Sequence, residues 1–332
     1  MLIYNMKCFF DRFRFLSEKV AVAVAFVLVC AVQVQAQNRG CKIVTDTIYS
    51  KILNAPRAYT VVLPGSFDAD KSKHYPILYL LHGMWENNAV WVNRGHVSEV
   101  MNRLVASGEA DEMVIVTPDA GGGDPHVVQN GYFDMPGWKY ESFFFEEFVP
   151  QIEKLYRAGG SKGKRAVAGL SMGGGGAASY GQRHSNMFCG VYAMSALMSI
   201  PAYDMANVSL TDKMGILTRS VIEHSCTRYV EEADNLRRDS LRTVAWFVDC
   251  GDDDFLFDRN IEFFQAMRKA GIHCELRVRD GGHDYEYWHS ALYTCLPFMS
   301  RLFMKNEGVS KSPPSFLYDK APTFTSWGFV IT

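Results

Sequence analysis

The chain has 332 residues, 48% of them hydrophobic and 21% charged, and its 36 acidic residues nearly balance its 34 basic ones. This near-neutral balance excludes an electrostatic argument for nucleic-acid binding. Most of the length suits one large α/β domain or two small ones, so we expect chemistry on a small molecule or a polymer.

The first 36 residues are predicted to be a secretory signal peptide and not part of the fold. An apolar run from Val20 to Val32 is followed by small residues at the cleavage positions, Val34-Gln35-Ala36, and is preceded by Lys7, Arg12, Arg14 and Lys19. The run is short for a membrane span, so the mature protein is expected to be secreted or periplasmic, without a stable span. A lipoprotein anchored through Cys30 is the alternative, although Val29 suits that reading poorly.

Residues 37–306 are predicted to form one α/β domain. Nearly continuous apolar runs are typical of strands buried on both faces of a mostly parallel sheet. Their alternation with helical spacing predicts a doubly wound sheet with helices on both faces. The expected strands are 57–63, 76–81, 112–117, 165–170, 243–250 and 274–279, and the expected helices are 97–107, 143–156, 259–270 and 290–304. Residues 307–332 have no clear period and are expected to be a peripheral extension.

The segment from Arg165 to Gly174 ends an apolar strand in Gly169-Leu170-Ser171-Met172-Gly173. This Gly-x-Ser-x-Gly pattern between a strand and a helix is typical of a nucleophile elbow, in which a strained turn exposes the serine hydroxyl. Ser171 is therefore the predicted nucleophile. The alternative is a flexible loop, because four glycines follow one another from Gly173 to Gly176.

A serine nucleophile needs a histidine as general base and a carboxylate that orients it. In the α/β-hydrolase arrangement these partners follow late strands, the acid before the histidine. The strand 243–250 runs into Asp252-Asp253-Asp254, and the strand 274–279 runs into Gly281-Gly282-His283. His283 is thus the predicted base, and the acid is expected among the three aspartates, with Asp254 furthest along the loop.

An oxyanion hole is expected from two backbone amides. The segment Leu81-His82-Gly83-Met84 follows an early strand, and Gly83 permits a turn that aims the next amide inward. The predicted donors are the amides of Met84 and Met172, the second being the residue after the nucleophile. His82, at the strand end, is expected to brace this loop and not to take part in catalysis.

Four ordered motifs now make the chain resemble the esterase D superfamily, and within it the secreted feruloyl and acetylxylan esterases of carbohydrate esterase family one. The motifs are Tyr75–Gly83, Ala168–Gly174, Cys250–Leu256 and Gly281–Tyr285, and the resemblance covers roughly residues 46–303. It implies the α/β-hydrolase fold and a serine esterase with the triad Ser171, Asp254 and His283. The family places its acid at the end of Gly-x-x-Asp, which falls on Asp254.

The expected activity is hydrolysis of feruloyl or acetyl esters on xylan fragments, with a small ester or an acylated oligosaccharide as partner and with no cofactor or metal. The export signal favours a cell-wall substrate over a cytosolic S-formylglutathione hydrolase-like thioesterase. A general short-chain carboxylesterase, an acyltransferase and a non-catalytic glycan-binding module remain alternatives. A calcium loop at residues 252–254 is not favoured, because the spaced oxygen ligands of such loops are lacking.

Substrate contacts are expected from aromatic residues near the mouth of the site. The candidates are Trp85, Trp138 and Trp288, with packing as the competing role for each. Asp119 also follows a strand that should end near the site. Residues 199–242 are polar and rich in helix formers, which indicates either a lid over the site or a surface helix pair. Six cysteines follow the signal peptide; Cys189, Cys250 and Cys274 are expected to be buried, and no disulfide pairing is assigned.

Overall fold

The computed structural model describes residues 40–200, 212–306 and 308. The predicted signal peptide, 1–36, lies outside the described residues, as does the C-terminal extension, 307–332, apart from Gly308. The domain boundaries at these two ends therefore stay predictions.

One eight-stranded sheet forms the centre of the described part of the chain, in the order β1-β2-β4-β3-β7-β8-β9-β10. β2 pairs antiparallel with β1 and with β4, and the remaining neighbours are parallel. The strands are β1 (Lys42–Ser50), β2 (Ala55–Leu63), β3 (Ile77–Leu81), β4 (Val114–Pro118), β7 (Arg165–Leu170), β8 (Gly190–Met194), β9 (Ala245–Gly251) and β10 (Cys274–Arg279). A separate small hairpin joins β5 (Asp134–Met135) to β6 (Trp138–Lys139).

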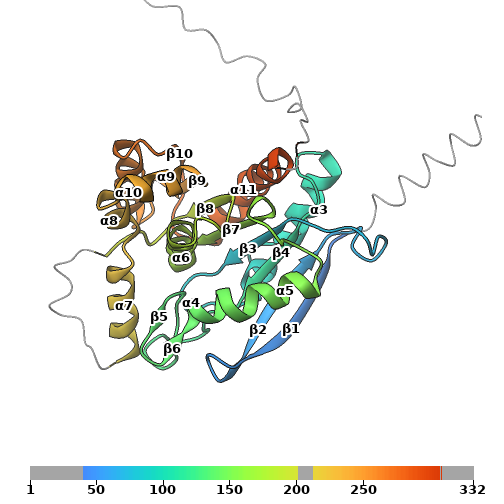
Figure 1. Ribbon diagram of the computed structural model, residues 1–332, viewed down its shortest axis with the longest axis horizontal. Helices are drawn as coiled ribbons and strands as arrows, with labels where there is room; N and C mark the ends of the chain where they lie inside the picture. Colours follow the sequence, from blue (N-terminus) through green and yellow to red (C-terminus); the bar gives the residue numbers. More distant parts are fainter. Residues whose placement is uncertain (1–39, 201–211, 307, 309–332) are drawn as a thin grey trace, which may run out of the picture.

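Helices cover both faces of this sheet (Figure 1). One face carries α2 (Val90–Asn93), α3 (Val97–Ser107) and the long α11 (Tyr285–Asn306). The other carries α4 (Tyr140–Ser142), the π-helix η1 (Phe143–Phe148), α5 (Val149–Leu155), α6 (Ser171–Arg183), α7 (Lys213–Glu223), α8 (Cys226–Glu231), α9 (Asn235–Arg242) and α10 (Phe257–Lys269). A 3₁₀ turn, η2 (Lys162–Lys164), precedes β7. This is the predicted α/β-hydrolase fold.

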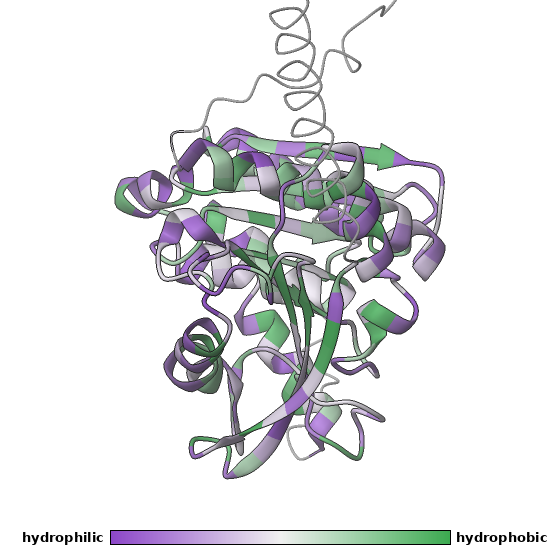
Figure 2. Cartoon of the chain, turned by 90° about the vertical axis from the view of Figure 1, so that its right-hand side faces the viewer, coloured by the Kyte–Doolittle hydropathy of each residue, from purple (hydrophilic) through white to green (hydrophobic). Residues whose placement is uncertain are grey.

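The central strands supply the core on both sides at once. In β3, Ile77, Tyr79 and Leu81 face the core beneath α5 and α6, while Leu78 and Leu80 face the core beneath α3 and α11. All five are fully buried. Successive side chains of a strand point to opposite faces, so a strand covered on both faces must be apolar throughout. The predominance of the hydrophobic colour in the central strands of Figure 2 reflects this constraint.

All six predicted strands are present, with bounds that shift by at most two residues, but β1 and β8 of the large sheet and the two hairpin strands, β5 and β6, are missing from the prediction. β1 is an edge strand in which Val44 and Ile48 pack against the core while Thr45, Asp46 and Thr47 between them are exposed, so it lacks a continuous apolar run. β8 has only five residues and begins with a glycine. The predicted helix 143–156 starts as the π-helix η1 before it continues as α5.

The four glycines after Ser171 belong to α6, are buried, and do not form a flexible loop. A Cβ on Gly173 would lie 2.5 Å from the carbonyl oxygen of His82, and one on Gly175 would lie 2.3 Å from that of Leu197. The first turns of α6 are therefore pressed against the backbone after β3 and β8. Glycine is required here by close approach of neighbouring backbone.

Gly175→Ala is expected to destabilise the protein by about 1–3 kcal/mol, because its Cβ would collide with backbone that cannot move aside. Helix propensity alone predicts the opposite sign, a gain of about 1 kcal/mol. Denaturant unfolding measures the difference. Gly282→Ala serves as control, because its Cβ would meet only the Asp284 carboxylate, at 3.7 Å. A Gly175→Ala protein as stable as the parent would contradict the packing argument.

Candidate active site

Ser171 lies at the turn between β7 and α6. The backbone is extended at Leu170, and at Ser171 it switches to a positive φ of 52°. Positive φ is uncommon for a residue with a Cβ, and such strain persists only where surrounding packing holds it. The Oγ of Ser171 lies 2.9 Å from Nε2 of His283. This local geometry is that of a nucleophile elbow.

Asp254 and His283 come from the loops after two neighbouring parallel strands, β9 and β10. Parallel strands end at the same edge of a sheet, so their loops meet there. Nδ1 of His283 lies 3.0 and 2.9 Å from the two carboxylate oxygens of Asp254. Ser171, His283 and Asp254 thus form one continuous chain of hydrogen bonds.

The hydrogen-bond partners assign the tautomer of His283. A carboxylate only accepts, so Nδ1 carries the proton and donates it to Asp254. Nε2 is then the unprotonated nitrogen and accepts from the hydroxyl of Ser171. In this state the imidazole is prepared to take a proton from Ser171.

Asp254 is 5% exposed and remains ionised. Burial by itself raises the pKa of this carboxyl, but hydrogen bonds from His283, from the backbone N–H of Leu256 and from Ser195 outweigh it and hold the pKa below its ordinary value. The Leu256 bond measures 2.8 Å. A carboxylate that accepts several hydrogen bonds is stabilised in its charged form.

Ser195 supports the site from the end of β8 and was not identified from the sequence. It is fully buried, has a positive φ of 44°, and accepts a 2.9 Å hydrogen bond from Nε1 of Trp288. The ring of Trp288 stands edge-on to that of His283, with centroids 4.9 Å apart. The feature that singles out Ser195 is a positive φ in a buried non-glycine residue. A backbone angle of this kind is visible in the structure and not in the sequence.

Two of the three tryptophans predicted to contact the substrate are buried in the structure. Trp288 is 5% exposed and packs behind His283, so it offers no open ring face to a substrate. Trp138 is 6% exposed, stacks on Tyr140 and donates to the carbonyl of Gly131. In both residues burial of the ring and capture of the indole N–H favour packing. Trp85 is 60% exposed and stays a candidate contact.

The loop after β3 lies over the first turn of α6. The carbonyl of His82 crowds Gly173, and the amide of Gly83 donates to Glu86 Oε2 at 2.8 Å. Met172 belongs to the first turn of α6, where backbone N–H groups have no partner within the helix. The amides of Met84 and Met172 therefore belong to the two segments that flank Ser171, where an oxyanion hole would form.

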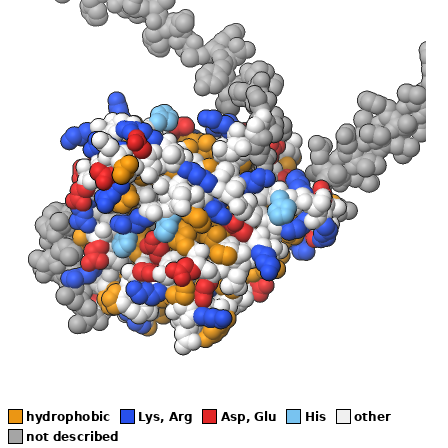
Figure 3. Space-filling view, in the orientation of Figure 1, with side chains coloured by type: hydrophobic (Ala, Val, Ile, Leu, Met, Phe, Trp, Pro, Cys, Tyr) orange, Lys and Arg blue, Asp and Glu red, His pale blue; other side chains and the backbone are white. Residues whose placement is uncertain are grey.

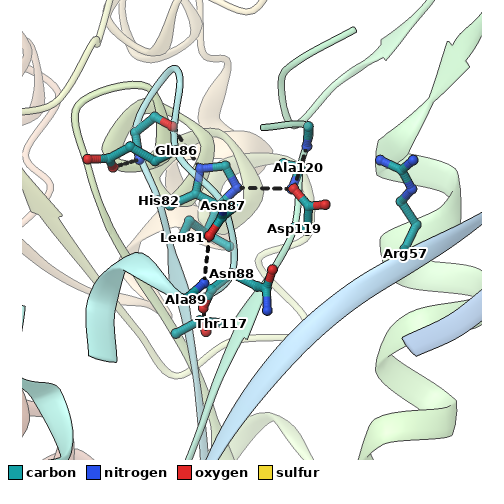
Figure 4. A network of polar contacts seen from close by, with 12 residues as sticks. Arg57, Leu81, His82, Glu86, Asn87, Asn88, Ala89, Thr117, Asp119 and Ala120 are labelled. Carbon is teal, nitrogen blue, oxygen red and sulfur yellow. Dashed lines mark hydrogen bonds and ion pairs between the residues drawn. The ribbon is translucent and has the colours of Figure 1, made fainter. Parts of the chain in front are cut away.

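His82 braces this loop, as expected, by bonds from both ring nitrogens. Nδ1 lies 2.7 Å from the carbonyl of Gly83, and Nε2 accepts from the amide of Ala120 at 3.0 Å. Complete burial lowers the pKa of His82 and outweighs the carboxylates of Asp119 and Glu86 nearby. The ring is neutral and ties the loops after β3 and β4 together (Figure 4). Asp119 lies beside this brace, 3.9 Å from Nε2.

Part of the predicted lid segment, 199–242, packs beside Met172; its residues 201–211 lie outside the described part of the chain. Leu217 and Val221 of α7, with Cys226 of α8, help to enclose an apolar cavity of about 10 Å³ next to Met172 and Gly175. This volume holds about one water.

Among the described residues, no cluster of side chains that could hold a metal ion includes a residue of the proposed triad. The carboxylates of Asp252, Asp253 and Asp280 come within 4.8 Å of one another, but all three are exposed. The amide of Gly281 donates to Asp252, which accounts for the turn. The six cysteines of this part of the chain are free thiols, and Cys189, Cys250 and Cys274 are buried as expected.

Acidic and basic side chains are interspersed over the face seen in Figure 3. Among the described helices, none combines the length and apolarity that a membrane crossing needs.

Comparison with known proteins supports the resemblance inferred from the motifs. A family model described as "Putative esterase" matches residues 50–299. The endo-1,4-beta-xylanase/feruloyl esterase of Xylanibacter ruminicola is 26% identical over 250 residues, 74% of this chain but only 30% of that protein. The acetyl esterase of Caldicellulosiruptor saccharolyticus is 23% identical over 274 residues, which are 76% of this chain and 96% of that one.

A solved structure of a ferulic acid esterase is 68% identical to this chain, with a TM-score of 0.76. The match covers 80% of this chain and 100% of the other. The family match, the fold and this relative agree with one another. The chain belongs to this esterase family and is a serine carboxylic ester hydrolase.

Proposed function

We propose that this protein is a secreted or periplasmic feruloyl esterase that releases ferulic acid from sugars of xylan fragments. One observation carries the proposal: the hydrogen-bonded chain from Ser171 through His283 to Asp254, in a domain 68% identical to a ferulic acid esterase. The predicted signal peptide supports export. Export in turn suits a polysaccharide substrate, which lies outside the cell. The name of the X. ruminicola relative, which joins xylanase and feruloyl esterase, supports the xylan context.

In the first half of the reaction, Ser171 Oγ attacks the ester carbonyl carbon while Nε2 of His283 takes its proton. The negative charge that develops on the carbonyl oxygen is met by the amides of Met84 and Met172. The carbon–oxygen bond to the sugar then breaks, and His283 passes the proton to the departing sugar oxygen. Asp254 holds the imidazole orientation and stabilises its positive charge.

In the second half, water replaces the sugar as the attacking group. His283 takes a proton from water, the resulting hydroxide adds to the acyl carbon, and the bond to Ser171 breaks. The proton returns to Ser171 Oγ, which leaves ferulic acid, ionised to ferulate once its own proton passes to water, and the starting enzyme. Water is the only co-reactant that this sequence needs. The exposure of Trp85, next to Met84, supports a contact between its ring and the acyl group.

Hydrolysis of methyl ferulate, acetylated xylan and p-nitrophenyl acetate, measured in parallel, tests the substrate. We expect the highest kcat/KM on the ferulate, and Ser171→Ala should lower kcat by about 10⁶-fold with an unchanged circular dichroism spectrum. Preference for acetylated xylan would replace the feruloyl proposal with the activity named for the C. saccharolyticus relative. Substantial turnover by Ser171→Ala would contradict the assignment of the nucleophile.

Asp254→Asn is expected to lower kcat by about 10⁴-fold, because a neutral amide neither fixes the tautomer of His283 nor stabilises its cation. Asp253→Asn is the matched control: its side chain is exposed, and it should change kcat by less than about twofold. Steady-state kinetics on methyl ferulate compare the two. If Asp253→Asn were the more damaging change, the acid would be assigned to the wrong residue.

A further inference from the structure

Phe255 lies between the proposed acid Asp254 and the buried Leu256, yet its own side chain is 76% exposed. The backbone on both sides is fixed: Leu256 N–H donates to the carboxylate of Asp254, and the N–H of Phe257 donates to the carbonyl of Asp254. The loop therefore holds Phe255 outward on a rigid support. An aromatic ring held in this way loses little conformational freedom when it binds a partner.

The ring of Phe255 contacts His283. Their centroids are 4.4 Å apart and the ring planes are inclined by 48°. A single exposed hydrophobic residue is ordinary on a protein surface and by itself indicates nothing. This one differs because the ring it touches is the proposed proton carrier. Trp288 covers the buried side of the same imidazole, so Phe255 occupies a solvent-facing side.

The direction of proton transfer identifies which half of the ester passes Phe255. His283 must give its proton to the departing alcohol oxygen, so that oxygen lies close to Nε2 in the transition state. Nε2 is also the nitrogen that faces Ser171. The alcohol half of the ester therefore leaves along the exposed side of His283, beside Phe255. The acyl half lies toward the amides of Met84 and Met172.

We propose that Phe255 determines specificity for the alcohol half of the ester, by stacking against the sugar ring that carries the acyl group. The inference rests on the proposed function. An aromatic face is electron-rich, and the ring C–H groups of a sugar carry a small positive charge, so the two surfaces attract. A methyl alcohol is too small to reach the ring face. Phe255 thus distinguishes a sugar ester from a simple alkyl ester with the same acyl group.

Two substrates that differ only in the alcohol test this role: methyl ferulate and the feruloyl ester of arabinose. Phe255→Ala is expected to raise KM for the sugar ester by about tenfold and to change both constants for methyl ferulate by less than about twofold. Phe255→Tyr, which keeps the ring, should restore KM. Leu236→Ala, which removes a 79% exposed apolar side chain on α9, is the matched control and should change neither substrate.

Two outcomes would overturn the proposal. An equal fall of kcat for both substrates would show that Phe255 acts by orienting His283, and unchanged constants for both would show that the ring has no role. Failure of the feruloyl assignment would look different, since the unaltered enzyme itself would then prefer acetyl esters. In that case the same comparison is made with methyl acetate and an acetyl ester of xylose, and the same two outcomes count against Phe255.

Discussion

The close approach of α6 to the backbone after β3 and β8 is the constraint on which the rest of the site depends. Gly173 and Gly175 permit it, because any Cβ there would overlap the carbonyls of His82 and Leu197. This contact holds Ser171 in its strained conformation and places the first turn of α6 beneath the loop of Met84. The proposed nucleophile and the proposed amide donors are thus positioned by the same contact, before any substrate binds.

A buried polar network then fixes the acid and the base. Asp254 is out of water but accepts hydrogen bonds from His283 and Leu256, so its charge is kept where an unpaired carboxylate would be protonated. Ser195 and Trp288 extend this network behind the imidazole. Rigid support of this kind reduces reorganisation during the reaction, and the strain at Ser171 and Ser195 shows that local stability is given up for geometry.

The aromatic side chains near the proposed site divide into two groups: those that are buried in packing and those that are exposed to solvent. Trp138 and Trp288 are buried and satisfy their indole N–H groups internally, at Gly131 and Ser195. Trp85 and Phe255 are exposed on the loops that carry the proposed oxyanion donor and acid. Residue type alone does not separate the two groups, since a tryptophan near a site in sequence serves packing as readily as binding.

What the sequence alone determined is local: the strand-turn-helix around Ser171, the order of the acid and His283, and the apolar runs of the central strands. These follow from periodicity and from motif residues that neighbours in the chain already constrain. The tertiary structure decided the rest. It shows that the glycine run is helix, brings in β1 and Ser195, buries Trp288 and leaves Phe255 exposed. Those properties depend on contacts between residues far apart in the chain, which local patterns around these residues do not specify.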